Sequence, residues 1–238
     1  MAEPVHGPIR DLLADGLDRL GYRPATGQLD RLARHAEEIE LWNPKLKLVA
    51  ATGRELVIRH TLDSLAGIDT IVQSLGRTTD AASYRIADLG SGAGFPGIPI
   101  AIMYPELRID LVERSGRRAG FLRNAVAAAR ISNASVCEIG LEAYRGPVPL
   151  AVYRALQPLT RHLVAALRTI SGGDGVVCAY KGRREIVQAE LEQLHRDGVE
   201  LQSMIVPVEV PFLNEERHLL LFGAGLQTVS STLQVRSV

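Results

Sequence analysis

The decapeptide DLGSGAGFPG, residues 88–97, holds four glycines in its last eight positions. Counted from Gly92, it matches Gly-x-Gly-x-x-Gly, the loop of dinucleotide-dependent dehydrogenases. Counted from Asp88, it reads Asp-x-Gly-x-Gly-x-Gly, the pattern of loops that surround S-adenosylmethionine. In either register the glycines let the backbone approach a ligand closely and adopt positive φ angles. The stretch therefore predicts a nucleoside-binding turn, and its surroundings must decide between the two registers.

The position of Pro96 favours the register that starts at Asp88. An apolar strand, YRIADL at residues 84–89, runs directly into the loop, and a helix is expected to begin at about Pro96. Proline suits the first helical turn because its missing N–H would have no partner there. In the dehydrogenase register that turn should offer N–H groups to a pyrophosphate, and Gly90 would have no role. The residues that we expect to form an S-adenosylmethionine loop are Asp88, Gly90, Gly92 and Gly94.

An acidic residue follows the next apolar strand. Glu113 ends the run IDLVE, 23 residues after Gly90. A carboxylate at this place accepts hydrogen bonds from both ribose hydroxyls of a nucleoside, which either type of cofactor offers. Glu113 therefore supports a nucleoside cofactor without choosing between the two registers.

Strands and helices alternate from about residue 80 onward. Strands are expected at Tyr84–Leu89, Arg108–Glu113, Ala134–Ile139, Val148–Arg154, Gly175–Lys181, Leu201–Val210 and Arg217–Phe222. Helices are expected at Pro96–Met103, Gly116–Ala129, Leu156–Ile170 and Arg184–Arg196. This alternation predicts an α/β fold with a mostly parallel, doubly wound sheet. Because the last two strands have no helix between them, we expect an antiparallel last strand, as in the Rossmann-like, seven-stranded sheet of class I S-adenosylmethionine-dependent methyltransferases.

The N-terminal third has a different pattern. Residues 9–75 show apolar positions at helical spacing and no convincing strand. We therefore expect an N-terminal helical extension at residues 1–79, a Rossmann-like domain at 80–225 and a C-terminal tail at 226–238.

Composition is that of an ordinary globular protein. Of 238 residues, 46% are hydrophobic, and 27 basic residues balance 27 acidic ones. Zero net charge argues against a protein that holds naked nucleic acid by bulk electrostatics alone. No apolar run is long enough to span a bilayer, and no signal peptide is recognised, so a cytoplasmic monomer is expected. Cys137 and Cys178 lie in apolar runs without metal-ligand spacing, which predicts buried thiols and no metal site.

Several further strings accompany the glycine loop. They are Trp42-Asn43, RHTLDSL at 59–65, ERSGRRAGFLRN at 113–124, SNASV at 132–136, YRALQPL at 153–159, YKGR at 180–183 and ERHLLL at 216–221. Together with DLGSGAGFPGIPIAI at 88–102, they resemble the RsmG (GidB) family of bacterial methyltransferases over roughly residues 38–222. That resemblance implies S-adenosylmethionine as the cofactor and N7 of a guanine in small-subunit (16S) ribosomal RNA as the target. It also implies ribosomal RNA or the 30S particle as the partner, and cofactor contacts from Gly90, Phe95, Leu141, Glu142 and Arg154.

The chain departs from the family pattern at four positions. Lys47 and Val49 replace an Asn and a Thr after Trp42-Asn43, Tyr153 stands where a Ser is usual, and Pro149 stands where an acid opens the fourth strand. We expect these changes to lie near the RNA or cofactor face.

The absence of one methyltransferase motif from the chain agrees with methylation at guanine N7. N7 already carries a free lone pair, so methyl transfer needs positioning and electrostatics rather than a general base. The end of the fourth strand reads AVYRALQP and has no Asn/Asp-Pro-Pro-aromatic motif of the kind associated with exocyclic amines. Arg154, which follows that strand, is the expected substrate-positioning residue, with a surface arginine as the alternative.

Other basic residues are candidates for RNA contact. They are Arg114, Arg117, Arg118 and Arg123 after the second strand, and Lys181 and Arg183 after the fifth. Ordinary solvated charge explains either group equally well. His60 and Asp63 have the spacing of an Asp–His contact on one helix. Arg217 and His218 are expected to face away from the carboxyl ends of the parallel strands.

Three other functions remain open at this point. One is an S-adenosylmethionine enzyme that acts on another RNA base or a small molecule. A second is a nicotinamide-dependent oxidoreductase in the Gly92 register. A third is a non-catalytic RNA-binding or assembly factor that retains the fold.

Overall fold

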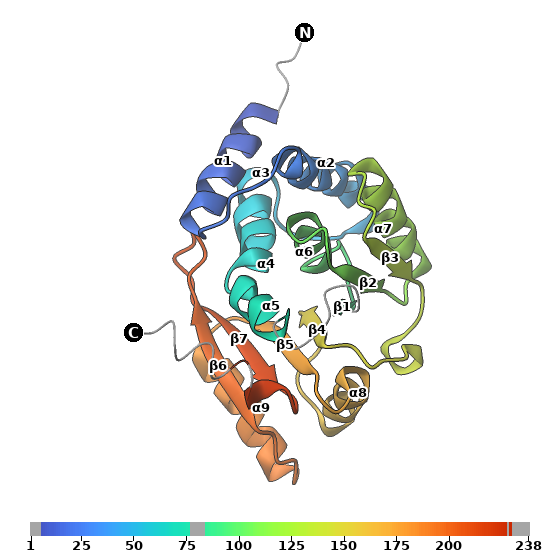
Figure 1. Ribbon diagram of the computed structural model, residues 1–238, viewed down its shortest axis with the longest axis vertical. Coiled ribbons are helices and arrows are strands. Elements are labelled where there is room, and N and C mark those ends of the chain that lie inside the picture. The colour runs from blue at the N-terminus through green and yellow to red at the C-terminus, as the bar shows by residue number, and fades with distance from the viewer. Residues whose placement is uncertain (1–5, 77–83, 228, 230–238) are drawn as a thin grey trace.

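The computed structural model describes residues 6–76, 84–227 and 229 and contains a twisted seven-stranded sheet (Figure 1). The strands are β1 (Arg85–Leu89), β2 (Arg108–Val112), β3 (Ala134–Cys137), β4 (Leu150–Arg154), β5 (Val176–Lys181), β6 (Ser203–Val208) and β7 (Arg217–Phe222). Their order across the sheet is β3-β2-β1-β4-β5-β7-β6. Only β7 pairs antiparallel, with β5 on one side and β6 on the other. The predicted fold class and the antiparallel last hairpin are confirmed.

The strand order reverses between β1 and β4, which pair directly. In open α/β sheets a crevice forms at this reversal, beyond the carboxyl ends of the strands, and ligands bind there. The glycine loop follows β1, so the topology brings it to the crevice. The segment after β4 reaches the same place from the neighbouring strand.

Both faces of the sheet are buried along its central strands, which explains why those strands are mostly apolar. Successive side chains of β5 alternate, with Cys178 and Tyr180 in one hydrophobic cluster and Val177 and Ala179 in the other. The first cluster includes α6 (Gly97–Met103) and α7 (Gly116–Ala128), and the second includes α8 (Arg161–Ser171) and α9 (Arg184–Arg196).

The N-terminal helices share the first of these clusters. They are α1 (His6–Arg19), α2 (Gln28–Leu46), α3 (Gly53–Leu56), a π-helical turn (Val57–Leu62), α4 (Asp63–Leu65) and α5 (Ile68–Gly76). Helix α2 packs along α6 and α7, as the blue and green ribbons of Figure 1 show. The sequence pattern did not predict α5 as a separate helix. The expected boundary at residues 79 and 80 lies outside the described residues.

Helix α8 begins five residues later than expected. The prediction of a helix from Leu156 was wrong because Pro158 disfavours helical backbone in the residue before it. Thr160 then caps the helix, its hydroxyl accepting from the N–H of Leu163 at 3.2 Å. Residues 155–160 are consequently a loop at the sheet's carboxyl edge, and Ala155 has a positive φ of 51°.

The expected direction of Arg217 and His218 was also wrong. Because β7 is antiparallel, its first residues lie beside the last residues of β5, and His218 pairs with Lys181 in register. Both side chains therefore belong to the edge where the parallel strands end. Nδ1 of His218 donates to the carbonyl of Gly182 at 2.7 Å.

The two cysteines differ in their surroundings. Cys178 is buried in the middle of β5, and burial raises the pKa of its thiol. Cys137 is only partly buried and is the last residue of β3. The prediction of a buried thiol is confirmed for Cys178 and is wrong for Cys137.

Candidate active site

The glycine loop turns sharply behind the end of β1. Gly90 has a φ of 73°, and its N–H donates to the carbonyl of Val112 at 2.8 Å, which ties the loop to β2. A Cβ on Gly90 would lie 2.6 Å from Cδ1 of Leu156. The absence of a side chain here therefore lets the loop after β4 approach the loop after β1.

Asp88 points into the protein and not toward the crevice. It is fully buried, and its Oδ2 accepts from the N–H of Gly97 at 3.0 Å, at the first turn of α6. Burial raises the pKa of this carboxyl to about 7, although the Gly97 bond lowers it in part. The geometry gives Asp88 a role in orienting α6 behind the loop, whereas the sequence suggested cofactor contact.

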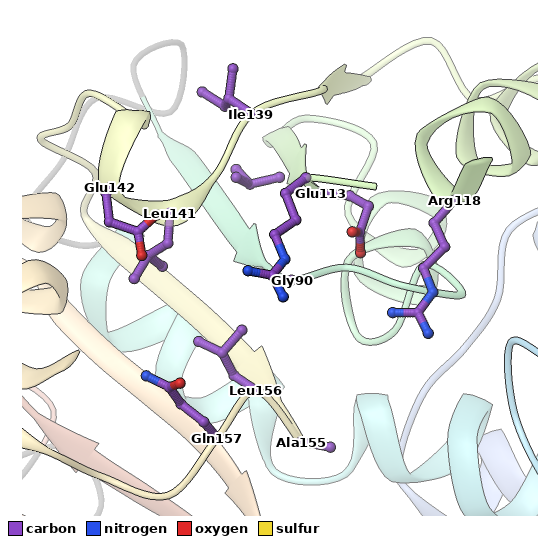
Figure 2. A pocket seen from close by; sticks show the side chains of 11 residues that line it. Gly90, Glu113, Arg118, Ile139, Leu141, Glu142, Ala155, Leu156 and Gln157 are labelled. Carbon is purple, nitrogen blue, oxygen red and sulfur yellow. The ribbon is translucent and has the colours of Figure 1, made fainter. Parts of the chain in front are cut away.

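A cavity of about 230 Å³ opens in front of the loop (Figure 2). Of the predicted cofactor residues, Gly90, Glu113, Leu141 and Glu142 line it. The Glu113 carboxylate accepts from the N–H of Gly92 at 3.1 Å and of Ser115 at 2.8 Å. Both bonds hold the carboxylate in the cavity wall, and each of its oxygens keeps further acceptor capacity for a ligand.

The predicted RNA-contact arginines of this region separate into two groups. Arg114 and Arg118 line the same cavity as Glu113, and Figure 2 shows the Arg118 and Glu113 side chains reaching toward the same space. Arg117 is exposed on α7. Arg123 pairs with Glu138 at 2.6 Å on the outer surface. Only the first two therefore adjoin the cofactor region.

A second cavity, of about 660 Å³, adjoins the first. The two share the walls formed by Ala155, Leu156 and Gln157, the loop that follows β4. Arg154 lines the second cavity and not the first. The shared loop therefore stands between the space predicted for a cofactor and the space that contains Arg154.

Three contacts from the N-terminal helices hold the Arg154 guanidinium. Nη1 donates to the carbonyl of Arg59 at 3.1 Å and to Asp63 Oδ2 at 3.3 Å, and Nη2 donates to Nδ1 of His60. The π-helical turn makes the first contact possible. The N–H of Asp63 bonds the carbonyls of Ile58 and His60, so the Arg59 carbonyl is left to accept from Arg154.

Asp63 connects two arginines of the second cavity. Its carboxylate lies 3.3 Å from Arg154 Nη1 and 3.5 Å from Arg217 Nε. Burial, the larger influence, raises the pKa of Asp63, while the two arginines act in the opposite sense. Burial and the neighbouring Arg154 charge lower the pKa of His60 to about 3, so this histidine is neutral at pH 7. In place of the expected Asp63–His60 contact, both residues bind Arg154.

Phe95 lies behind Arg154 and is 3% exposed. The guanidinium carbon of Arg154 is 5.1 Å from the ring centroid, and the rings of His60 and His35 flank the same phenylalanine at 5.2 Å and 4.9 Å. Nε2 of His35 donates to the carbonyl of Ala93 at 2.8 Å, inside the glycine loop. Phe95 therefore supports the loop and the arginine from behind.

A family model for GidB, described as rRNA small subunit methyltransferase G, matches residues 28–220. This chain belongs to the GidB family. The matched range includes both cavities together with the helices that hold Arg154. The resemblance drawn from the glycine loop and the accompanying strings is thereby confirmed.

Relatives of the family match along nearly the whole chain. A protein from Treponema pallidum (strain Nichols), named ribosomal RNA small subunit methyltransferase G, is 36% identical over 220 residues, 88% of this chain and 91% of its own. One of the same name from Xanthomonas axonopodis pv. citri (strain 306) is 34% identical over 221 residues, 91% and 93% of the two chains.

Two solved structures share the fold at low identity. The METTL16 MTase domain gives a TM-score of 0.55 at 11% identity, over 91% of this chain and 92% of that one. Human methyltransferase 10 domain containing protein gives 0.52 at 12% identity, over 82% and 98%. The sheet order and these likenesses identify a class I methyltransferase fold.

The departures from the GidB pattern fall in different places. Lys47 and Val49 lie in a loop after α2, beside the second cavity's Ala50. Tyr153 lines the second cavity and is 1% exposed. Pro149 precedes β4 and therefore lies at the opposite edge of the sheet, so its expected position near the RNA or cofactor face was wrong. Its carbonyl accepts from the N–H of Val176 at 2.9 Å.

The sequence pattern missed the contribution of the N-terminal helices to the site. Lys181 was expected at the crevice and lines the second cavity, whereas Arg183 is exposed at the start of α9. His35 and Arg217 were not predicted as site residues. The His-x-x-Asp-Ser-Leu string was the available signal, since its His60 and Asp63 both bind Arg154.

None of the helices described here is long and apolar enough to cross a membrane.

Proposed function

We propose that this GidB-family chain transfers the methyl group of S-adenosylmethionine to N7 of a guanine in 16S ribosomal RNA of the small subunit. The observation that carries the proposal is the pair of adjoining cavities that share the Ala155–Gln157 wall. One has the residues of a nucleoside site and the other contains Arg154. Relatives at 34–36% identity carry the name of a small-subunit ribosomal RNA methyltransferase, which supports the same reaction.

The first cavity fits S-adenosylmethionine. Gly90 has no Cβ to collide with Leu156, so both residues line the cavity, and the Glu113 carboxylate lies in the same wall. Glu113 would accept from the ribose hydroxyls, and Leu141 and Glu142 would contact the adenosine from the opposite side. Bound there, the cofactor supplies an electrophilic methyl group on a sulfonium. Gly92 and Gly94 shape the loop, and Asp88 and Phe95 support it from inside.

The second cavity would hold the target base. Guanine N7 needs no proton removed before it accepts a methyl group, so the chain's task is to orient the base and exclude water. Arg154, held by three contacts, would orient the base. The low pKa of His60, about 3, fits a site in which no side chain must act as a base at pH 7.

The RNA would approach over the mouths of the two cavities. Arg114, Arg118 and Lys181 line them, while Arg117, Arg123 and Arg183 extend the basic residues outward. With zero net charge, the protein would depend on a structured ribosomal substrate such as the 30S particle for additional contacts. We further infer a cytoplasmic monomer, with residues 1–79 a helical region, 80–225 the catalytic domain and 226–238 a tail.

Mass mapping of ribosomal RNA from cells with and without the gene tests this function. We expect one N7-methylguanine of 16S RNA to be lost with the gene and restored by the parent protein. The variant Gly92→Asp should not restore it, because an acidic side chain at a φ of 54° disrupts the loop that bonds Glu113. An unchanged methylation pattern in cells without the gene would refute the RNA target.

A further inference from the structure

An ion pair lies in the wall of the second cavity, on the side of β5. Nζ of Lys181 is 2.6 Å from Oε2 of Glu190. The two side chains are 13% and 18% exposed, so both are largely desolvated but reach the cavity surface. Apart from a long 3.4 Å bond from the N–H of Leu159, the described contacts leave Glu190 with unused acceptor positions.

Of the two purines, guanine complements the hydrogen-bonding pattern of this pair. An ammonium group only donates, and an ionised carboxylate only accepts, through two oxygens. The Watson–Crick edge of guanine presents the reverse sequence, an acceptor at O6 followed by donors at N1 and N2. Adenine places a donor opposite the lysine and an acceptor opposite the carboxylate. The pair therefore matches guanine and opposes adenine.

The strand order sets the direction of a base held in this way. Lys181 ends β5, Arg154 ends β4 and Gly90 follows β1, and these strands are consecutive in the sheet. Neighbouring strands are about 4.8 Å apart, so the span from β5 to β1 is about 10 Å. A guanine with its Watson–Crick edge at β5 would extend across β4, and its N7, on a different edge of the ring system, would face the first cavity.

We propose that Lys181 and Glu190 read the Watson–Crick edge of the target guanine and so set the base specificity of the enzyme. This inference rests on the proposed function for the identity of the base. Single-stranded or flipped-out RNA bases are commonly read on this edge. A pair with only a structural role would stabilise the loop between β4 and α8 and have no preference between bases.

Reversing the pair separates the two roles. The double variant Lys181→Glu with Glu190→Lys retains an ion pair but exchanges donor and acceptor positions. Glu190→Gln keeps the shape of the side chain and replaces one acceptor oxygen by a donor NH2. Asp30→Asn is the matched control, because it removes the charge of an exposed pair with Arg10 at 2.8 Å between α1 and α2.

Two measurements are made on each folded variant. The first is kcat/KM for methyl transfer to 30S particles from cells without the gene. The second is binding of GMP and of AMP in the presence of S-adenosylhomocysteine. Hydrogen bonds to charged groups are worth about 1.5–3 kcal/mol, so we expect kcat/KM to fall about 10- to 100-fold in the double variant and in Glu190→Gln. The parent and Asp30→Asn should bind GMP at least about 10-fold more tightly than AMP, and both altered-pair proteins should lose that preference.

Parental kcat/KM in the double variant would overturn the inference, and so would a parent that binds GMP and AMP equally. If the double variant does not fold, the nucleotide preference of Glu190→Gln decides. The proposed function fails separately, when the parent transfers no methyl group to guanine N7 of the particles. In that case the GMP and AMP measurements still support or refute the role of the pair.

Discussion

The substitution Asp88→Asn should remove a pH-dependent loss of stability. Asp88 is fully buried, and burial raises its pKa from 3.8 to about 7 in the folded protein. In the unfolded chain the pKa of the carboxyl group returns to its ordinary value of 3.8. Asparagine retains an oxygen that accepts from the Gly97 N–H, but it does not titrate.

The sign follows from which state keeps the proton. Below pH 4 both states are protonated, and the group's contribution to stability is fully present. Between about pH 4 and 7 the unfolded chain loses the proton while the folded protein retains it, so stability falls as the pH rises. Each pKa unit corresponds to about 1.36 kcal/mol, which gives a loss of about 4 kcal/mol over the whole window. Between pH 5 and 7 the loss is about 2 kcal/mol, because the folded group is already half ionised at pH 7.

Two histidines impose the opposite slope. Burial lowers the pKa of His35 to about 4 and of His60 to about 3, so their stabilising effect is present above pH 6.5 and is lost as the pH falls. The parent's stability curve therefore mixes both signs, and the difference between parent and Asp88→Asn isolates the carboxyl group. Urea unfolding at pH 5, 6 and 7 gives the two free energies. Parallel curves over this range would refute the buried, protonated Asp88.

Three substitutions test the packing and the site. Gly97→Ala brings a Cβ to 2.5 Å from Cδ2 of Leu111, and should lower the free energy of unfolding by about 1–3 kcal/mol in urea titrations; an unchanged midpoint would contradict the close packing of α6. Gly90→Ala forces a Cβ against Leu156 at a φ of 73°, and should weaken S-adenosylhomocysteine binding at least about 10-fold by calorimetry, with wild-type affinity arguing against the cavity assignment. Arg154→Lys removes the planar guanidinium that bonds three partners at once, so kcat should fall at least about 10-fold while S-adenosylhomocysteine affinity stays within about 3-fold. An unchanged kcat with weakened S-adenosylhomocysteine binding would make Arg154 a cofactor residue.

The sequence predicted correctly which residues lie together where strand topology alone determines their position. Glu113 and Gly90 follow adjacent parallel strands, and the carboxyl ends of such strands necessarily meet at one edge. It failed where a single side chain's direction matters. Asp88 lies one residue before the end of β1, and its side chain faces α6, because successive residues of a strand point to opposite faces. Arg217 was misplaced although an antiparallel last strand was expected, because the first residues of such a strand lie beside the last residues of its parallel neighbour, here β5.

The cluster around Arg154 could not be read from local pattern. Its members come from positions 63, 154 and 217, and no periodicity links residues so far apart. The π-helical turn that frees the Arg59 carbonyl has no residue signature comparable to a proline or glycine. The strings of the family resemblance marked these segments as a group, but the contacts between them required the fold.

The N-terminal helices contribute to the proposed active site as well as to the scaffold. Helix α2 provides His35, which donates to the Ala93 carbonyl in the cofactor loop, and the π-helical turn provides the contacts that fix Arg154. Phe95 lies between these two anchor points, in contact with both histidine rings and with the arginine. A shift of these helices would therefore move the glycine loop and Arg154 together. Because in-line methyl transfer depends on the alignment of two bound groups, a single rigid support for both is what the chemistry requires.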